Sequence, residues 1–503
     1  MPDYMYLLES RLSPEQRAAL ERVQELSRSQ DLNVYLTGGA VRDLISGQPI
    51  RDLDFTVEGN PVKIVRELEK GGARVLAENE KLRHYEMLFA GDADGSISAA
   101  RDDVYERPGS KPEIRFAGIT EDLRRRDFSV NAIAISLNAQ SRGLLLDPTN
   151  GLADLERQEV RALTIHSFTN QPIRLMRILR YCARMGFKME ARTQEWFDLA
   201  FERGLQQNLE GSDVGAEIRA AGREENPVAT LKQWEARGLL TAAHPQLQKR
   251  KPDYDSLNKL AKVRMNLLGA GIRPRLQTSN TYYIFSRLKP REAAALMKAL
   301  EFRAAEIEAV AKLVPESQKI VQTLKSRKMN APREAYFYIA SVLPENLAFI
   351  EVELPNPAAL SKIRSYVQKW RPLYLSLPIS ELDALGVSRG PKFDKIIEQF
   401  FEAQLRGKGK TPEDRTKLLR QLAGIKDEPK KRPEKEKKSK TKEGHSTPET
   451  KPGSRQAPAT PKAKTGAGSA ATTPRQGSAK AHKSGEGVRS GRGAAKRNKA
   501  GTR

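Results

Sequence analysis

The 503-residue chain is too long for one ordinary domain, so we expect two to four folded units. Its 87 Lys and Arg against 63 Asp and Glu give a formal charge of +24, which favours a polyanionic partner such as nucleic acid or an acidic membrane surface. The single cysteine, Cys182, excludes an intramolecular disulfide, and no Cys/His cluster has zinc-site spacing. No stretch approaches the roughly 18 apolar residues of a membrane span, and the N-terminus lacks a signal-peptide pattern. We therefore expect a cytoplasmic protein that does not enter a membrane.

The first 160 residues mix strand-like runs with helical stretches. The strand-like runs are NVYLTGG (33–39), RDLDFTV (51–57), FSVNAIAISL (128–137) and RGLLLDP (142–148). Apolar residues recur at helical spacing in PVKIVRELEKGG (61–72). This mixture predicts an α/β domain.

From Pro172 to about Ile425, apolar residues recur every three or four positions, with Gly and Pro between the runs, which predicts an array of helices. From Lys426 onward large apolar residues almost vanish, and residues 426–503 carry 22 Lys and Arg against 7 Asp and Glu. Such a segment cannot bury a core, so we expect a disordered tail. It would add weak, sequence-independent RNA affinity, or serve only as a solvated tail.

Two carboxylates lie two residues apart in the run DLDFTV. Side chains two apart on a strand point to the same face, so Asp52 and Asp54 should project together. Such a pair can hold Mg²⁺, and two metal ions about 4 Å apart can activate a hydroxyl and stabilise leaving pyrophosphate. A lone Asp-x-Asp is more often an exposed strand edge, so this interpretation needs further motifs.

A glycine pair, Gly38 and Gly39, follows an apolar strand upstream of the two aspartates. Glycines let the backbone approach a triphosphate, whose oxygens can accept main-chain N–H groups, and Arg42 can add positive charge. On its own a Gly-Gly pair is more often a simple turn.

With these motifs in order, the chain resembles the bacterial class II CCA-adding enzyme and poly(A) polymerase family of the nucleotidyltransferase superfamily. The resemblance covers roughly residues 30–240 and rests also on EDLRRRDFSVNAIAI (121–135), on the hinge-like LLLDPTNGLADLE (144–156) and on NQPIRLMR (170–177). It implies an α+β multidomain fold, with a polymerase beta-like α/β nucleotidyltransferase head and an all-helical neck and body. We expect a catalytic head over residues 1–160, a nucleotide- and RNA-binding neck over 161–250, an RNA-binding body over 251–425 and the disordered basic tail over 426–503.

The resemblance also implies roles for individual residues. Asp52 and Asp54 would be catalytic and hold the metal. An arginine can bind phosphate, and Asp or Asn can hydrogen-bond ribose hydroxyls, which suits a ribonucleotide substrate. The residues that would bind the nucleotide are Gly38, Gly39, Arg42, Arg126, Asp127, Asn131, Gln171, Arg174 and Arg177. For the segment around Arg126, a basic turn that opens a buried strand is the alternative.

The fourth motif departs from the family. Members usually show Glu-Asp-Pro-x-Arg-x-x-Arg, in which the Asp and the first Arg read the base edge of C or A, whereas this chain has Asn170 and Gln171. Glutamine offers one acceptor oxygen and two donor hydrogens, so the fixed polarity of the Asp is lost and the nucleotide choice is open. Alternatively, Asn170 only caps the following helix. That helix carries a basic stripe, which we expect to face the nucleotide, made of Arg174, Arg177, Arg180 and Arg184.

Two more positions depart from the family. Ser96 stands where many relatives carry an acidic residue, so a third carboxylate would be missing there. The neck motif Ser-x-Glu-Arg-Ile is represented by residues 212–218 (SDVGAEI), which predicts weaker support for the base-reading residues.

The leading hypothesis is a template-independent RNA nucleotidyltransferase that adds CMP or AMP to RNA 3′ ends by two-metal catalysis. Its cofactor would be Mg²⁺, its substrates ATP and possibly CTP, and its partner a tRNA or another RNA. The motifs leave open CCA addition against poly(A) addition, and the oligomeric state. The alternative is a non-catalytic RNA-binding protein on the same scaffold, but a binding protein has no need of the Asp52/Asp54 pair.

Overall fold

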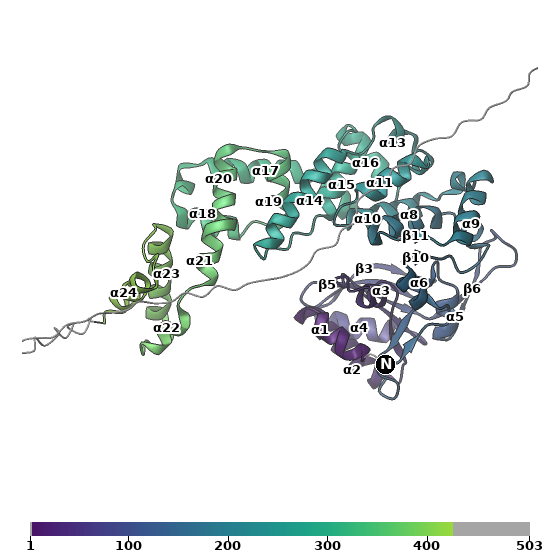
Figure 1. Cartoon of the computed structure of the whole chain (residues 1–503), viewed down its shortest axis with the longest axis horizontal. Coiled ribbons are helices and arrows are strands. Elements are labelled where there is room, and N and C mark those ends of the chain that lie inside the picture. Colours follow the sequence, from purple (N-terminus) through teal and green to yellow (C-terminus); the bar gives the residue numbers. More distant parts are fainter. Residues whose placement is uncertain (1–2, 426–503) are drawn as a thin grey trace, which may run out of the picture. The chain divides into compact units, whose positions relative to one another are not determined.

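A seven-stranded sheet dominates the N-terminal part of the computed structural model, which describes residues 3–425 (Figure 1). The strand order is β3-β4-β5-β2-β1-β8-β9, so β2 is central. The β2–β5 pair is parallel, and the other pairs in this sheet are antiparallel. The strands are β1 (Val34–Thr37), β2 (Leu53–Val57), β3 (Arg74–Asn79), β4 (His84–Phe89), β5 (Ala93–Ala99), β8 (Ala134–Ser136) and β9 (Leu145–Leu146).

Side chains of the central strand β2 point alternately to the two faces of the sheet. Leu53 and Phe55 are fully buried in the main hydrophobic core, and Phe55 pairs with Leu36 of β1. Because side chains alternate along a strand, Asp54 projects from the other face, which it shares with Asp52 just before the strand. The apolar residues of β2 thus fix the direction of the two carboxylates.

Helices cover the sheet. Helix α3 contacts β1 and β2, and α2 contacts β5 and α4. Helix α2 begins with a reciprocal cap, in which the Ser13 hydroxyl accepts the Gln16 N–H and the Gln16 side chain accepts the Ser13 N–H. These elements are α1 (Tyr4–Arg11), α2 (Pro14–Ser29), α3 (Gly39–Ile45), α4 (Val62–Lys70), α5 (Ile119–Arg124), a 3₁₀ turn η1 (Ser129–Asn131) and α6 (Gly151–Arg157).

Two small strand pairs lie outside the sheet. Strands β6 (Arg101–Val104) and β7 (Glu113–Phe116) form an antiparallel hairpin joined by residues 105–112, which we call the β6–β7 loop. Strands β10 (Glu159–Val160) and β11 (Lys188–Met189) pair in parallel, so β10, after α6, is tied to the segment after α8.

Between residues 167 and 425 the described chain is almost entirely helical. Several helices begin with a proline in the first turn, where its missing N–H costs nothing, among them α16, α19 and α23. The elements are α7 (Ser167–Asn170), α8 (Arg174–Met185), α9 (Ala191–Glu202), η2 (Leu205–Asn208), α10 (Gly211–Gly222), α11 (Val228–Ala236), α12 (Leu239–Ala243), α13 (Pro245–Lys249), α14 (Tyr254–Gly269), α15 (Gln277–Phe285), α16 (Pro290–Ala299), α17 (Ala304–Lys325), η3 (Arg327–Asn330), α18 (Pro332–Ala340), α19 (Pro344–Glu353), α20 (Pro357–Ser365), a π-helical turn η4 (Tyr366–Trp370), α21 (Arg371–Leu375), α22 (Ile379–Ala384), α23 (Pro391–Leu405) and α24 (Pro412–Ala423).

One hydrophobic core runs from Met5 in α1 to Phe401 in α23. Within it Trp234 of α11 is fully buried, and its indole Nε1 donates to the Met176 carbonyl at 2.8 Å. A second, smaller core joins α22, α23 and α24 around Phe400. The continuous main core explains how α8 is held against the elements before it.

The predicted fold class, an α/β head followed by a mostly helical region, is confirmed. The two-residue strand β11 is the departure from the expected helical array. The predicted domain boundaries at residues 160 and 250 stay predictions, and the tail prediction falls on residues 426–503, outside the described residues. Among residues 3–425, no helix is long and apolar enough to cross a membrane.

Replacement of Gly215 by alanine should destabilise the protein. Gly215 lies in α10, and a Cβ there would lie 1.8 Å from the Leu300 carbonyl oxygen, so the backbone must shift. We expect Gly215→Ala to lower the free energy of unfolding by about 1–3 kcal/mol or more, measured by urea unfolding. The matched control is Gly269→Ala in α14, where a Cβ meets nothing within 4 Å. Equal unfolding midpoints for the two variants would contradict the prediction.

Candidate active site

The two aspartates form a pair of carboxylates with no counter-charge of their own. Asp54 is in register with Ser96 of β5, and the Ser96 hydroxyl donates to Asp54 Oδ1 at 2.7 Å. Burial, and next the negative charge of Asp52, raise the pKa of Asp54 to about 7. The Ser96 hydrogen bond and nearby arginines oppose this rise without cancelling it. The pair is therefore poised to accept a positive charge.

Gly39 leaves open space over this pair. A Cβ on Gly39 would lie 3.8 Å from Asp54 Oδ2, 4.0 Å from Asp52 Oδ1 and 3.5 Å from Arg42 Nη2. Any side chain at this position would fill the space above the carboxylates. The described residues contain no group of three or more His, Cys, Asp or Glu side chains placed to hold a metal ion. Two carboxylates beneath an open cradle fit a divalent cation that takes its other ligands from water and phosphate.

Arg42 is buried beside the carboxylate pair. Its Nε donates to Asp43 Oδ1 at 3.0 Å, its Nη1 donates to Asn131 Oδ1 at 2.6 Å, and its guanidinium lies over the Tyr181 ring, 5.1 Å from the centroid. These contacts fix the guanidinium beside Gly39, next to the space over the two carboxylates. The predicted contact of Arg42 with a triphosphate stays a prediction.

Arg126 closes the other side of the glycine pair. A Cβ on Gly38, whose φ of +66° favours glycine, would lie 3.1 Å from Arg126 Nη1. The same guanidinium donates twice to Asp122 Oδ2, at 3.1 and 2.8 Å, and once to the Asn131 carbonyl. Asp122 is fully buried, and although burial would raise its pKa, the charges of Arg126 and Arg125 hold that pKa below its usual value.

Asn131 and Asp127 connect the glycine motif to helix α8. Asn131 accepts from Arg42 and donates through Nδ2 to Asp127 Oδ1 at 3.0 Å, while Arg177 Nη1 donates to Asp127 Oδ2 at 3.2 Å. Burial alone would raise the pKa of Asp127, but the positive charges of Arg177 and Arg174 hold it below its usual value. The structure thus brings together the second and fourth sequence motifs.

The arginines of α8 are paired inside the protein, so the basic stripe is not a uniform nucleotide-facing surface. Arg177 Nε and Arg180 Nε donate to the two oxygens of Glu217, at 2.6 and 2.9 Å. Arg184 Nη2 lies 2.5 Å from Asp43 Oδ2. Glu217 comes from α10, and its carboxylate holds both arginines. The weaker support expected from this segment for the base-reading residues stays a prediction.

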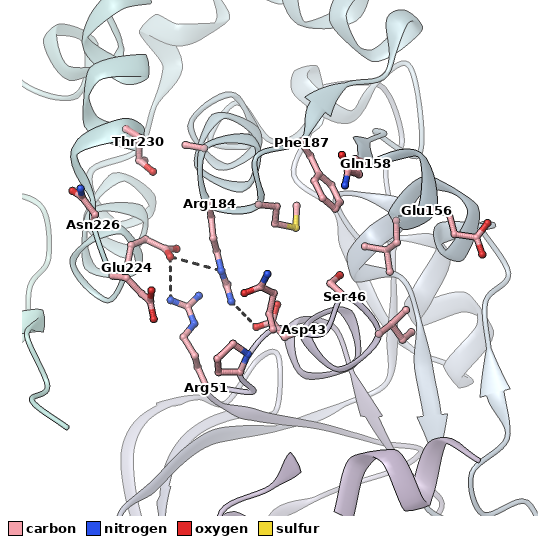
Figure 2. Close-up of a pocket in the computed structure, with 18 residues that line it drawn as sticks. Asp43, Ser46, Arg51, Glu156, Gln158, Arg184, Phe187, Glu224, Asn226 and Thr230 are labelled. Carbon is pink, nitrogen blue, oxygen red and sulfur yellow. Dashed lines mark hydrogen bonds and ion pairs between the residues drawn. The ribbon is translucent and has the colours of Figure 1, made fainter. Parts of the chain in front are cut away.

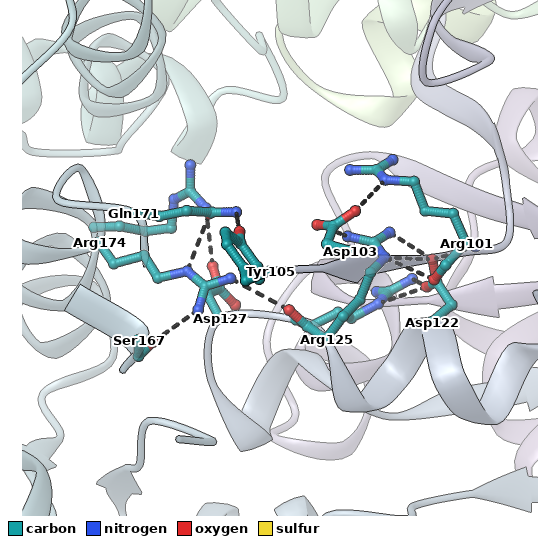
Figure 3. Close-up of polar contacts among 11 residues, drawn as sticks. Arg101, Asp103, Tyr105, Asp122, Arg125, Asp127, Ser167, Gln171 and Arg174 are labelled. Carbon is teal, nitrogen blue, oxygen red and sulfur yellow. Dashed lines mark hydrogen bonds and ion pairs between the residues drawn. The ribbon is translucent and has the colours of Figure 1, made fainter. Parts of the chain in front are cut away.

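Asn170 does not cap α8, which corrects the simpler alternative for that residue. It is the last residue of α7, and its Oδ1 accepts the Gly109 N–H at 2.9 Å. Gln171 Oε1 accepts from Arg174 Nε at 3.1 Å, and Gln171 Nε2 donates to the Tyr105 hydroxyl at 3.1 Å (Figure 3). Arg174 is buried, and Figure 3 shows it beside Asp127.

Comparison with known proteins finds one family model and several relatives that are similar to parts of this chain. A family model described as the poly A polymerase head domain matches residues 34–161. The A-adding tRNA nucleotidyltransferase of Geobacter sulfurreducens is 26% identical over 84% of this chain and 48% of its own length. That of Aquifex aeolicus is 36% identical over 40% of this chain and 24% of its own length. The CC-adding tRNA nucleotidyltransferase of Deinococcus radiodurans is 35% identical over 35% of this chain and 47% of its own length.

The chain is thus similar to the poly A polymerase head family over residues 34–161, and to tRNA nucleotidyltransferases over parts of its length. It spans less than half the length of each of these three relatives. Nucleotidyltransferases of this family generally use divalent metal ions, and the open carboxylate pair under Gly39 fits such an ion.

A charged junction joins the glycine motif to the helical region. Arg51 Nη1 lies 3.1 Å from Glu224 Oε2, and Arg184 reaches both Asp43 and Glu224 (Figure 2). These residues line a cavity of about 580 Å³, whose lining includes neither Asp52 nor Asp54. Sequence reasoning missed Glu224 and Tyr105, because their partners lie far away along the chain and neither stands in a motif.

Removing the charge of Glu217 should destabilise the protein at neutral pH. Glu217 is buried between Arg177 and Arg180, so Glu217→Gln leaves one buried guanidinium group, Arg180, and one half-buried group, Arg177, short of a counter-charge. We expect a loss of about 3 kcal/mol or more at pH 7, measured by urea unfolding. Glu195→Gln, at an exposed position of α9, is the control.

The loss should depend on pH. Burial would raise the pKa of Glu217, but Arg180 and Arg177 hold it below its usual value. The carboxylate therefore stabilises the fold above the unfolded-state pKa of about 4.3, and this contribution disappears as the pH falls through the lower folded-state value. Wild type and Glu217→Gln should converge in stability only once the pH has fallen below the folded-state pKa of Glu217, which lies under the unfolded value of about 4.3. A difference that persisted unchanged into acid would contradict the ion-pair explanation.

Proposed function

We propose that this chain is a template-independent RNA nucleotidyltransferase that adds AMP, CMP or both to RNA 3′ ends. The observation that carries the proposal is the unpaired Asp52/Asp54 carboxylate pair beneath the open cradle of Gly39. A protein that only bound RNA would gain nothing from two like charges held together, where the charge of Asp52 helps to raise the pKa of Asp54.

Asp52 and Asp54 would hold the metal, for which we propose Mg²⁺. A bound Mg²⁺ would supply Lewis acidity toward the attacking 3′ hydroxyl and the leaving pyrophosphate. The chain's own residues do the rest: the glycine pair lets the triphosphate approach the backbone, and Arg126 and Arg42 border that cradle with positive charge. The Asn131 and Asp127 side chains offer hydrogen bonds that suit ribose hydroxyls.

We assign base recognition to Gln171 and Arg174. A guanidinium can only donate hydrogen bonds, so the oxygen of Gln171 is the atom that faces Arg174. The pair then presents one acceptor oxygen beside guanidinium donors. This pattern matches the edge of cytosine or adenine, where an amino group donates next to a ring nitrogen that accepts.

We propose tRNA as the acceptor, because the relatives that share the largest parts of this chain are named A-adding and CC-adding tRNA nucleotidyltransferases. Both specificities occur among them, so the choice between A and C falls to experiment. RNA backbones are bound through charge and shape, which suits a chain with an excess of Lys and Arg.

The deciding experiment incubates the purified full-length protein with Mg²⁺ and radiolabelled tRNA that lacks part or all of its terminal CCA. A generic RNA oligonucleotide runs in parallel, and each NTP is supplied singly and in combination. We expect added nucleotides on tRNA, with CTP or ATP preferred over UTP and GTP. Long A-tails on both RNAs would instead establish a poly(A) activity.

Asp52→Ala/Asp54→Ala should lower the rate of nucleotide addition by more than about a hundredfold. Mutating residues that merely support a metal ligand can already cost about that much, and this variant removes the ligands themselves. Asp255→Ala, an exposed aspartate of α14, is the control and should leave the rate unchanged. If wild type and double variant are equally inactive while both bind RNA, the chain is an RNA-binding protein on this scaffold. If the double variant keeps full activity, the proposed site is wrong.

A further inference from the structure

Both residues that depart from the family's Glu-Asp pair hold the β6–β7 loop. Asn170 Oδ1 accepts the Gly109 N–H at 2.9 Å, and Gln171 Nε2 donates to the Tyr105 hydroxyl at 3.1 Å (Figure 3). A Cβ on Gly109 would touch the Thr169 side chain at 3.4 Å, so the loop lies directly against this segment. The base-reading position is therefore in contact with a loop more than sixty residues earlier in the chain.

The amide of Gln171 is held at both ends with one polarity. Its oxygen must face Arg174 Nε, because a guanidinium has no acceptor, so its NH₂ must face Tyr105, whose hydroxyl accepts. Arg174 is fixed in turn: its Nη1 donates to Ser167 Oγ at 2.8 Å and its Nη2 to the Arg125 carbonyl at 3.3 Å. Arg174 sets the polarity of the amide, and Tyr105 sets the direction of its plane.

We propose that Tyr105 is a specificity-determining positioning residue, which keeps the Gln171 oxygen and Arg174 together on the edge that meets the incoming base. The inference rests on the proposed function and on the assignment of base recognition to Gln171. An aspartate at this position presents an acceptor whichever way it turns, whereas a glutamine does so only when its amide is held. Tyr105 thus favours bases that carry an amino group at this edge, adenine and cytosine, over guanine and uracil, which carry a carbonyl there.

Removal of the Tyr105 hydroxyl tests this role. In Tyr105→Phe the Gln171 NH₂ loses its acceptor, and the amide can turn about its remaining contact with Arg174, bringing a donor to the base edge. We expect the preference for ATP over GTP, or for CTP over UTP, to fall by about fivefold, the ratio that corresponds to one neutral hydrogen bond of about 1 kcal/mol. The measurement is kcat/KM for each NTP on the acceptor RNA that the wild type extends. Tyr6→Phe removes the same atom from an exposed position and is the matched control.

A second background separates positioning from packing. Gln171→Glu has the same length but two equivalent oxygens, so turning the group changes nothing that the base meets. Tyr105→Phe should therefore leave nucleotide preference unchanged when it is combined with Gln171→Glu. A merely structural role would lower kcat/KM equally for all four nucleotides in both backgrounds.

The outcomes are distinct. The inference is supported if Tyr105→Phe lowers the nucleotide preference when residue 171 is Gln and leaves it unchanged when residue 171 is replaced by Glu. An equal loss for all nucleotides, or the same change of preference in both backgrounds, overturns it while leaving the proposed function intact. A wild type that adds no nucleotide to any RNA removes the proposed function, and the inference with it.

Discussion

Two carboxylates held side by side repel each other. The side chains around Asp52 and Asp54 leave that repulsion in place. Arg42 and Arg126 are close enough to neutralise the pair, yet each is hydrogen-bonded to an acid of its own, Asp43 and Asp122. The pair is therefore left with only the hydroxyl of Ser96, a neutral partner. Under the proposed function, a divalent cation would supply the positive charge that these side chains do not give to the pair.

Carboxylates that pair with the arginines of α8 also hold that helix against the rest of the site. Asp127, in the segment before η1, forms an ion pair with Arg177 of α8. Glu217 of α10 forms ion pairs with both Arg177 and Arg180. Burying such groups costs desolvation energy, which is offset only when every charge finds a partner in good geometry. A shift of α8 would leave several charges unpaired at once, so the network favours one position of Arg174 relative to Asp127.

The sequence was enough to predict features that depend on local periodicity. The alternation of DLDFTV placed Asp52 and Asp54 on one face, and the structure puts both within 4 Å of a Cβ on Gly39. The 3.6-residue repeat likewise placed the arginines of α8 on one side of that helix. It could not show what that side meets, because the partners come from α3, α10 and the segment before η1.

Asn170 and Gln171 show why local reasoning failed where it did. Capping is a short-range preference, and it was overridden by Gly109, whose N–H needed an acceptor 61 residues away. Under the proposed function, Gln171 in place of the family's aspartate leaves one negative charge fewer beside Arg174, so this part of the site would attract a triphosphate more strongly and discriminate less between bases. Selectivity between bases that Gln171 cannot provide alone would then depend on the residues that hold its amide in place. The β6–β7 loop contacts that amide through the Tyr105 hydroxyl, a neutral group, so under the proposed function it would fix the amide without adding a charge to the site.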